Sequence, residues 1–253
     1  QTRAGNPEYE RARRLMAAEA TAAIAGAFDA GASTVYVNDS HGGFRNLPPD
    51  LLDARAQAIQ GKPRYLSMAS GVELGVAGMV CIGYHGRAQG RGILAHTINS
   101  FAFARIAFNG QELGELGIYG LLAGQYGVPV IAASGDDQFI AEHQALFPAT
   151  RFIQVKQAQG AHSGVSLSPE AACAAIRAGV AQAVAQAPGA APLTMAGPIV
   201  VDLQTQTVAL ADLFCQWPTL ERLAGDALRF NAPDTESAVR MLNGLSAMSS
   251  MLR

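Results

Sequence analysis

VCIGYHGRAQGRGILAH, residues 80–96, joins the end of an apolar run to two histidines separated by a glycine-rich segment. The run Val76–Ile82 is typical of a buried strand, which ends at Gly83. In an open α/β sheet, ligands bind just beyond the carboxyl ends of the strands. We therefore expect His85, which directly follows the strand, and His96 to lie at a functional site.

The same pattern occurs earlier in the chain. Thr34–Val37 reads as a strand and leads into NDSHGG, residues 38–43, which contains His41. Two strand ends that each supply a histidine predict one shared site.

Strands alternate with helices along most of the chain, which favours a mostly parallel sheet with helices on both faces. We predict a three-layer α/β/α fold with a mostly parallel central sheet and a smaller C-terminal α/β portion. Residues 188–198 are rich in Pro, Gly and Ala and form the best linker candidate. The expected division is a catalytic domain over residues 1–188 and a portion packed on it over residues 189–253.

Local signals predict several individual elements. Asn109-Gly110 is a strong hairpin signal, and Asp136 and Asp137 are expected to cap the helix that follows them. We expect helices over residues 7–30, 47–60, 116–126, 138–147, 171–187, 208–215 and 235–248, and strands over 34–37, 64–68, 79–82, 98–108, 128–133, 151–156, 199–203 and 227–230.

Composition narrows the class of protein. The 253 residues are 49% hydrophobic and 15% charged, which suits a well-filled α/β core, and the net charge is -2. Without a basic run or a long apolar stretch, neither nucleic acid nor a membrane is expected as a partner. The start of the sequence does not resemble a signal peptide. Three widely spaced cysteines indicate a reducing compartment, so a cytoplasmic location is expected.

The histidines have structural readings as well as functional ones. A loop histidine that is hydrogen-bonded to backbone is about as common as a ligand, so His41, His85 and His96 do not prove a metal site. His143 lies between Glu142 and Gln144 and reads as a surface residue, and His162 is open to either reading. No GxSxG, CxxC, HExxH or P-loop motif occurs, and the glycines of residues 83–92 do not follow the dinucleotide-binding pattern.

Carboxylates near the predicted site also have two readings. Hydrolytic zinc takes histidine and carboxylate ligands and keeps one position open for water. Glu115 begins a predicted helix and could serve either as a ligand or as a partner of the helix dipole, as could Glu112. Asp39 is expected to orient the loop that holds His41.

Several short motifs in series resemble the DppA-type zinc D-aminopeptidases. The resemblance extends to about Pro169 and becomes weak after Pro188. The matching segments are NPEYERARRLMAAEA (6–20), VNDSHGG (37–43), GYHGRA (83–88), LAHT (94–97), GELG (114–117), ASGDD (133–137) and VK (155–156).

The resemblance implies a dinuclear zinc aminopeptidase that removes the N-terminal residue, often a D-residue, from short peptides. It implies that His41, His85 and Glu115 bind metal and that His96 is the catalytic residue. It also implies a homodecamer with an enclosed channel. We expect His96 to transfer a proton, although a nucleophilic histidine is the role usually described for the family.

The sequence departs from the family pattern in two places. The family's first strand carries an S-x-D-x-E-G motif with the remaining metal ligands, and we expect these ligands upstream of residue 1. Ala161 and Val165, with His162 between them, replace basic residues after the VK strand. An amidase or β-peptide aminopeptidase therefore remains an alternative, as does a metal-poor assembly subunit without catalysis.

Overall fold

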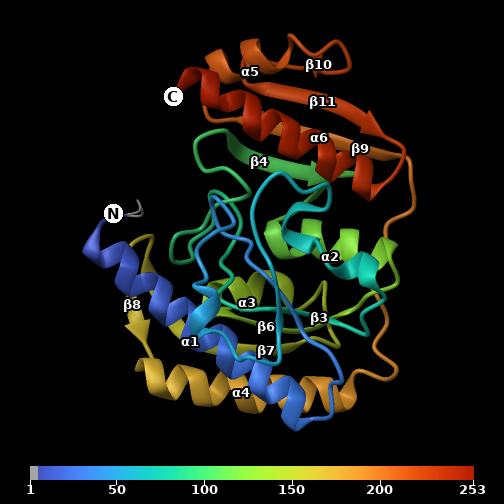
Figure 1. Cartoon of the computed structure of the whole chain (residues 1–253). Coiled ribbons are helices and arrows are strands. Elements are labelled where there is room, and N and C mark those ends of the chain that lie inside the picture. Colours follow the sequence, from blue (N-terminus) through green and yellow to red (C-terminus); the bar gives the residue numbers. More distant parts are fainter. Residues whose placement is uncertain (1–4) are drawn as a thin grey trace.

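The computed structural model describes residues 5–253, which contain three β-sheets, six α-helices and four short 3-10 helices (Figure 1). The helices are α1 (Pro7–Asp29), α2 (Glu115–Gln125), α3 (Asp137–His143), α4 (Pro169–Gln186), α5 (Val208–Phe214) and α6 (Thr235–Met248). The strands are β1 (Tyr36–Asn38), β2 (Gln57–Ile59), β3 (Met79–Cys81), β4 (Phe103–Phe108), β5 (Gln111–Glu112), β6 (Val130–Asp136), β7 (Arg151–Gly160), β8 (Ser163–Ser166), β9 (Ile199–Thr205), β10 (Glu221–Arg222) and β11 (Ala227–Ala232).

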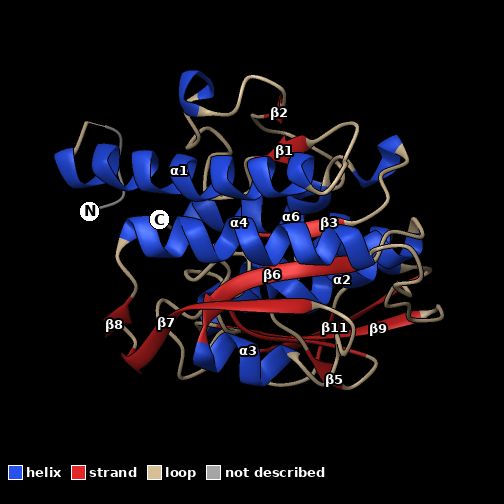
Figure 2. Ribbon diagram, turned by 90° about the horizontal axis from the view of Figure 1, so that it is seen from below, coloured by secondary structure: helices blue, strands red, loops and turns tan. Residues whose placement is uncertain are grey.

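The mostly parallel sheet has the strand order β3-β6-β7-β8, in which only β8 is antiparallel to its neighbour. Helices α1 and α4 pack side by side on one face of this sheet, and α3 lies on the other (Figure 2). The α1–α4 contact is close at Gly26, where an added Cβ would lie 2.3 Å from the Arg177 carbonyl oxygen. The α/β fold expected from the sequence is therefore present, with helices on both faces of this sheet.

The second large sheet has the order β10-β11-β9-β4-β5 and is antiparallel throughout. Strands β4 and β5 form the hairpin predicted at Asn109-Gly110, where both residues have positive φ. Because β4 pairs with β9, strands from either side of residue 188 share one sheet. Helices α2, α5 and α6 pack against it around a common apolar core.

Two local predictions between β1 and β3 are wrong. Residues 47–60 do not form a helix: Pro49–Leu51 is a single 3-10 turn, and β2 pairs in parallel with β1 instead. Residues 64–68 do not form a strand, because the chain turns there into the short 3-10 helix Ser67–Ala69. The prolines at 48 and 49 and the short apolar runs fit a helix or a strand equally well. In residues 57–59, pairing with β1 produced a strand.

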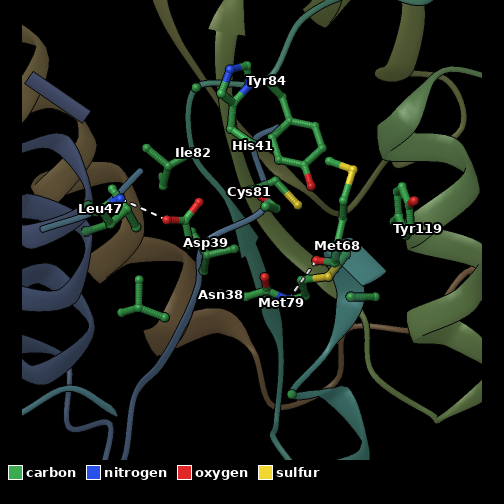
Figure 3. Close-up of a pocket in the computed structure, with 18 of the residues that line it drawn as sticks. Asn38, Asp39, His41, Leu47, Met68, Met79, Cys81, Ile82, Tyr84 and Tyr119 are labelled. Atoms are coloured by element: carbon green, nitrogen blue, oxygen red, sulfur yellow. Dashed lines mark hydrogen bonds between the residues drawn. The ribbon is translucent and has the colours of Figure 1, made fainter. Parts of the chain in front are cut away.

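A cavity of about 2390 Å³ separates the small β1–β2 sheet from β3. Figure 3 shows side chains from both strands at this cavity: Asn38 and Asp39 come from β1 and the residue after it, Met79 and Cys81 come from β3, and Tyr119 of α2 lies to the right. The loops that follow β1 and β3 both line this cavity, so it extends to the predicted functional residues. Within residues 5–253, no helix combines the length and apolar character needed to cross a membrane.

Candidate metal centre

Three of the four predicted site residues meet at one point. His85, His96 and Glu115 each offer a ligand atom, and these atoms lie within 4.8 Å of one another. The Nε2 atom of His85 is 3.5 Å from Glu115 Oε2, and the Nε2 atom of His96 is 3.7 Å from Glu115 Oε1. The two imidazole rings stack, with their centroids 4.0 Å apart. Both rings therefore direct the same nitrogen toward one carboxylate.

The loop of residues 83–97, called the histidine loop from here on, fixes both rings through backbone carbonyls. It begins after β3 at Gly83, whose φ of 71° suits glycine. The Nδ1 atom of His85 lies 3.0 Å from the Gly86 carbonyl oxygen, and that of His96 lies 2.7 Å from the Leu94 carbonyl oxygen. A proton on each Nδ1 satisfies these hydrogen bonds, which leaves each Nε2 free to accept or to coordinate.

Glu115 is the first residue of α2 and is 5% exposed. Its Oε1 accepts a hydrogen bond of 2.8 Å from the backbone N–H of Ile98. Ile98 has a φ of 61°, a conformation that is strained for a β-branched residue and that clusters at functional sites. The backbone strain is thus located where the chain beyond the histidine loop meets the buried carboxylate.

The chemistry and spacing of this donor set fit zinc. Zinc in proteins binds imidazole nitrogens and carboxylate oxygens, and ligand atoms around one tetrahedral ion lie about 3.4 Å apart. The two nitrogen–oxygen separations of 3.5 and 3.7 Å are close to that spacing. If all three groups bound one ion, a fourth position would stay open, as hydrolytic zinc sites require.

Burial favours the neutral form of His85 and of two groups beside it, Tyr84 and Cys81. Burial lowers the pKa of His85 from its ordinary value, although the nearby Glu115 acts in the opposite direction. A neutral imidazole is the form that binds metal. Burial also raises the pKa of Tyr84, and it raises the pKa of Cys81 to about 12, so these groups stay protonated beside the site.

His41, the fourth predicted residue, lies outside the group formed by His85, His96 and Glu115. It is exposed, although it lines the same cavity and is near enough to lower the pKa of His85. Its loop, residues 39–47, is ordered by the buried Asp39 carboxylate, which accepts hydrogen bonds from the backbone N–H groups of Asn46 and Leu47. The orienting role predicted for Asp39 is confirmed.

The remaining candidate carboxylates have structural roles, and the prediction that His143 lies on the surface is wrong. Asp136 caps α3 by accepting from the Phe139 N–H, and Glu112 pairs with Arg87 and Arg105. His143 is 2% exposed rather than a surface residue, because α3 turns the face that carries Phe139 and His143 toward the sheet. His162 lies in the exposed turn between β7 and β8.

Comparison with known proteins gives one family, one relative matched by sequence and one solved structure. The family model described as D-aminopeptidase, Peptidase_M55, matches residues 1–244. The D-aminopeptidase of Bacillus subtilis (strain 168) is 36% identical over 165 residues, which are 65% of this chain and 60% of that protein. The solved structure of the Zn-dependent D-aminopeptidase DppA from Bacillus subtilis, described as a self-compartmentalizing protease, superposes with a TM-score of 0.93. It is 29% identical and covers 97% of this chain and 90% of its own.

Proposed function

Because this chain belongs to the Peptidase_M55 family of D-aminopeptidases, we propose that it is a zinc-dependent aminopeptidase. Its substrates are short peptides or amino-acid amides, from which it hydrolyses the N-terminal residue, with a preference for the D-configuration. The observation that carries the proposal is the group of His85, His96 and Glu115, whose spacing fits one zinc ion. Removal of zinc by a chelator should abolish hydrolysis of D-aminoacyl amides, and added zinc should restore it.

His85 and Glu115 are assigned to metal binding. Their donor atoms are fixed from the protein side by the Gly86 carbonyl and the Ile98 N–H. When bound, zinc supplies a Lewis acid that polarises the scissile carbonyl and lowers the pKa of a water molecule. Hydrolysis adds the hydroxyl of water to the carbonyl carbon, breaks the carbon–nitrogen bond and delivers a proton to the leaving amine.

His96 is assigned as the catalytic residue that moves this proton. Because its Nδ1–H donates to the Leu94 carbonyl, Nε2 faces the site and can take the proton from water and deliver it to the leaving nitrogen. The position of Nε2, 3.7 Å from Glu115, also suits a metal ligand, so the role needs a test that separates the two.

The test is His96→Ala, with His162→Ala as the matched control. Loss of a general acid–base group should lower kcat by about 10²–10⁴-fold while zinc content stays at the wild-type level. The control histidine lies in an exposed turn and should leave both quantities unchanged. Near-normal turnover of His96→Ala with intact zinc would remove His96 from the mechanism, and loss of zinc would make it a ligand.

A second zinc is proposed on the β1 side of the cavity, with His41 as one ligand and the Asp and Glu of a further strand as the others. β1 and β3 each pair on one side only within residues 5–253, and the cavity lies between them. The buried side-chain oxygen of Asn38 has no hydrogen-bond partner among the described residues. A strand between β1 and β3 would pair with both edges and bring carboxylates beside His41.

Metal analysis of the natural full-length protein tests the second site. An active dinuclear enzyme should hold about two zinc ions per chain. One ion per chain would contradict the second site and leave the first in place. A protein that holds no zinc would support the alternative, an assembly subunit without catalysis.

The turn between β7 and β8 gives a specific reason to test substrate class. The carbonyl of Ala161 accepts a hydrogen bond of 2.9 Å from the N–H of Leu94, and Leu94 in turn holds the ring of His96. The Ala161 backbone therefore lies next to the reacting groups, whereas the side chain of His162 is exposed and has no part in this contact. A panel of D-, L- and β-aminoacyl amides separates a D-aminopeptidase from an amidase or β-peptide aminopeptidase.

Assembly and location complete the proposal. The superposed relative is described as self-compartmentalizing, and we assign this chain to a homo-oligomer, a decamer, in the cytoplasm. Light scattering should give a mass ten times that of the chain, and a monomer would contradict the assignment.

A further inference from the structure

Helix α3 directs two carboxylates at the histidine loop, although neither belongs to the metal centre. The N-cap residue Asp136 accepts a hydrogen bond of 2.6 Å from the backbone N–H of Ile93. Glu142, near the other end of the helix, accepts bonds of 3.1 and 3.2 Å from the backbone N–H of Arg87. The two carboxylates thus hold both ends of the segment between His85 and His96.

The Glu142 carboxylate is enclosed where it meets the loop. Its oxygens lie so close to Gly86 and Gly114 that an added Cβ would be 3.3 Å and 3.1 Å away. Its side chain is 20% exposed, and burial raises the pKa of its carboxyl although Arg87 lowers it. Placing a carboxylate there costs desolvation free energy, which the bonds to Arg87 offset.

The peptide group between Gly86 and Arg87 links Glu142 to the metal centre. Its N–H, from Arg87, donates a hydrogen bond to the Glu142 carboxylate. Its carbonyl oxygen, from Gly86, lies 3.0 Å from Nδ1 of His85. The same carbonyl accepts a hydrogen bond of 3.2 Å from the backbone N–H of His96. Because a peptide group is planar, an acceptor that fixes the direction of the N–H also fixes the direction of the carbonyl.

We propose that Glu142 is a positioning residue that orients the Gly86–Arg87 peptide, and through it His85 and His96, so that it sets the affinity of the site for zinc. This inference rests on the proposed function. Groups that orient a metal-bound histidine act at one remove from the metal, and their loss typically costs about 10–100-fold in affinity.

The test compares Glu142→Gln with Glu112→Gln. Both carboxylates pair with the Arg87 guanidinium, Glu112 at 3.1 Å and Glu142 at 3.3 Å, but only Glu142 also accepts from the Arg87 backbone. Glu142→Gln keeps one oxygen that can accept a hydrogen bond from the Arg87 N–H, and its amide nitrogen cannot accept. It should lower zinc affinity by about 10–100-fold in competition with a chromophoric chelator. A partly exposed ion pair contributes little, so Glu112→Gln should change affinity by less than about fivefold.

Hydrogen exchange of the metal-free proteins supplies a second readout. Glu142→Gln should increase exchange at the amides of Arg87 and His96, and leave amides of β9 and β11 unchanged. If Glu142→Gln does not fold by circular dichroism, Glu142→Asp replaces it. That variant keeps the charge but draws the oxygens back, and should lose about tenfold in zinc affinity.

The outcomes are distinct. Unchanged exchange at the amides of Arg87 and His96 would show that Glu142 does not orient the peptide. Faster exchange at these amides with wild-type zinc affinity would show that this orientation does not set zinc affinity. Equal losses from Glu142→Gln and Glu112→Gln would assign the effect to the Arg87 side chain instead. A wild-type protein that binds no zinc would overturn the proposed function, and with it this inference.

Discussion

The loop that carries His41 follows β1 and the histidine loop follows β3; both line one cavity, yet they hold their histidines differently. In the histidine loop, each ring is bonded through Nδ1 to a carbonyl of its own loop, and each Nε2 faces Glu115. In the loop of residues 39–47, Asp39 organises the backbone, while the His41 ring is exposed. A well-ordered loop backbone is therefore not sufficient to direct a histidine ring at the metal centre.

The difference follows from what each loop packs against. The histidine loop lies between α3 and the start of α2, which contribute Asp136, Glu142 and Glu115. The loop of His41 follows β1, whose only partner within residues 5–253 is the short strand β2. The loop with more packing contacts is therefore the one that brings its histidines to the Glu115 carboxylate.

The largest test of this contrast is the pair His85→Ala and His41→Ala. The first should remove zinc from the centre and lower kcat/KM by about 10³-fold, since metal activation supplies several kcal/mol of transition-state stabilisation. The second should leave one zinc ion bound, measured by metal analysis of the dialysed full-length protein. Equal zinc losses in the two variants would show that the loops are equivalent in function.

His143 tests how tightly α3 packs beneath the histidine loop. Burial lowers the pKa of His143 to about 4. The unfolded chain binds this proton near pH 6.5 and the folded chain only near pH 4, so this contribution to stability is complete above pH 6.5 and is lost as the pH falls toward 4. The loss amounts to about 3 kcal/mol. Urea unfolding of wild type and His143→Gln across this range should show a flatter pH dependence for the variant. Parallel curves would contradict this pKa, and His162→Gln is the exposed control.

The smallest expected effect is in the loop of residues 39–47. Asp39→Asn replaces a carboxylate oxygen with an amide nitrogen that cannot accept from the backbone, and should lower the free energy of unfolding by roughly 1–3 kcal/mol. Asp50→Asn, at an exposed position of the 3-10 turn, is the control. Because the His41 ring has no part in this network, the first zinc should bind with wild-type affinity. Weakened binding of that ion would show that the two loops are coupled.

Local patterns predicted the elements whose signals lie within a few residues. The Asn109-Gly110 hairpin and the Asp136 cap of α3 each depend on one short-range interaction, and each is present. Two of the failed predictions depended on distant partners. The strand β2 needs β1, and burial of His143 needs the sheet beneath α3.

Glu142 illustrates what the pattern of residues could not reveal. In the sequence it is one polar residue beside His143, and nothing near it indicates a loop 55 positions away. Its function depends on the direction of a single peptide plane, which is set by packing and has no compositional signature.

The amino-acid sequence alone determined the alternation of strands and helices, the histidines at two strand ends and the carboxylate at the start of α2. These follow from periodicity, caps and turn residues, which act over one or two turns of chain. Only the tertiary structure decided which of those residues meet, because His85, His96 and Glu115 converge through the packing of a loop on two helices. Whether these side chains meet depends on distances across the folded protein, and the order of residues along the chain does not give those distances.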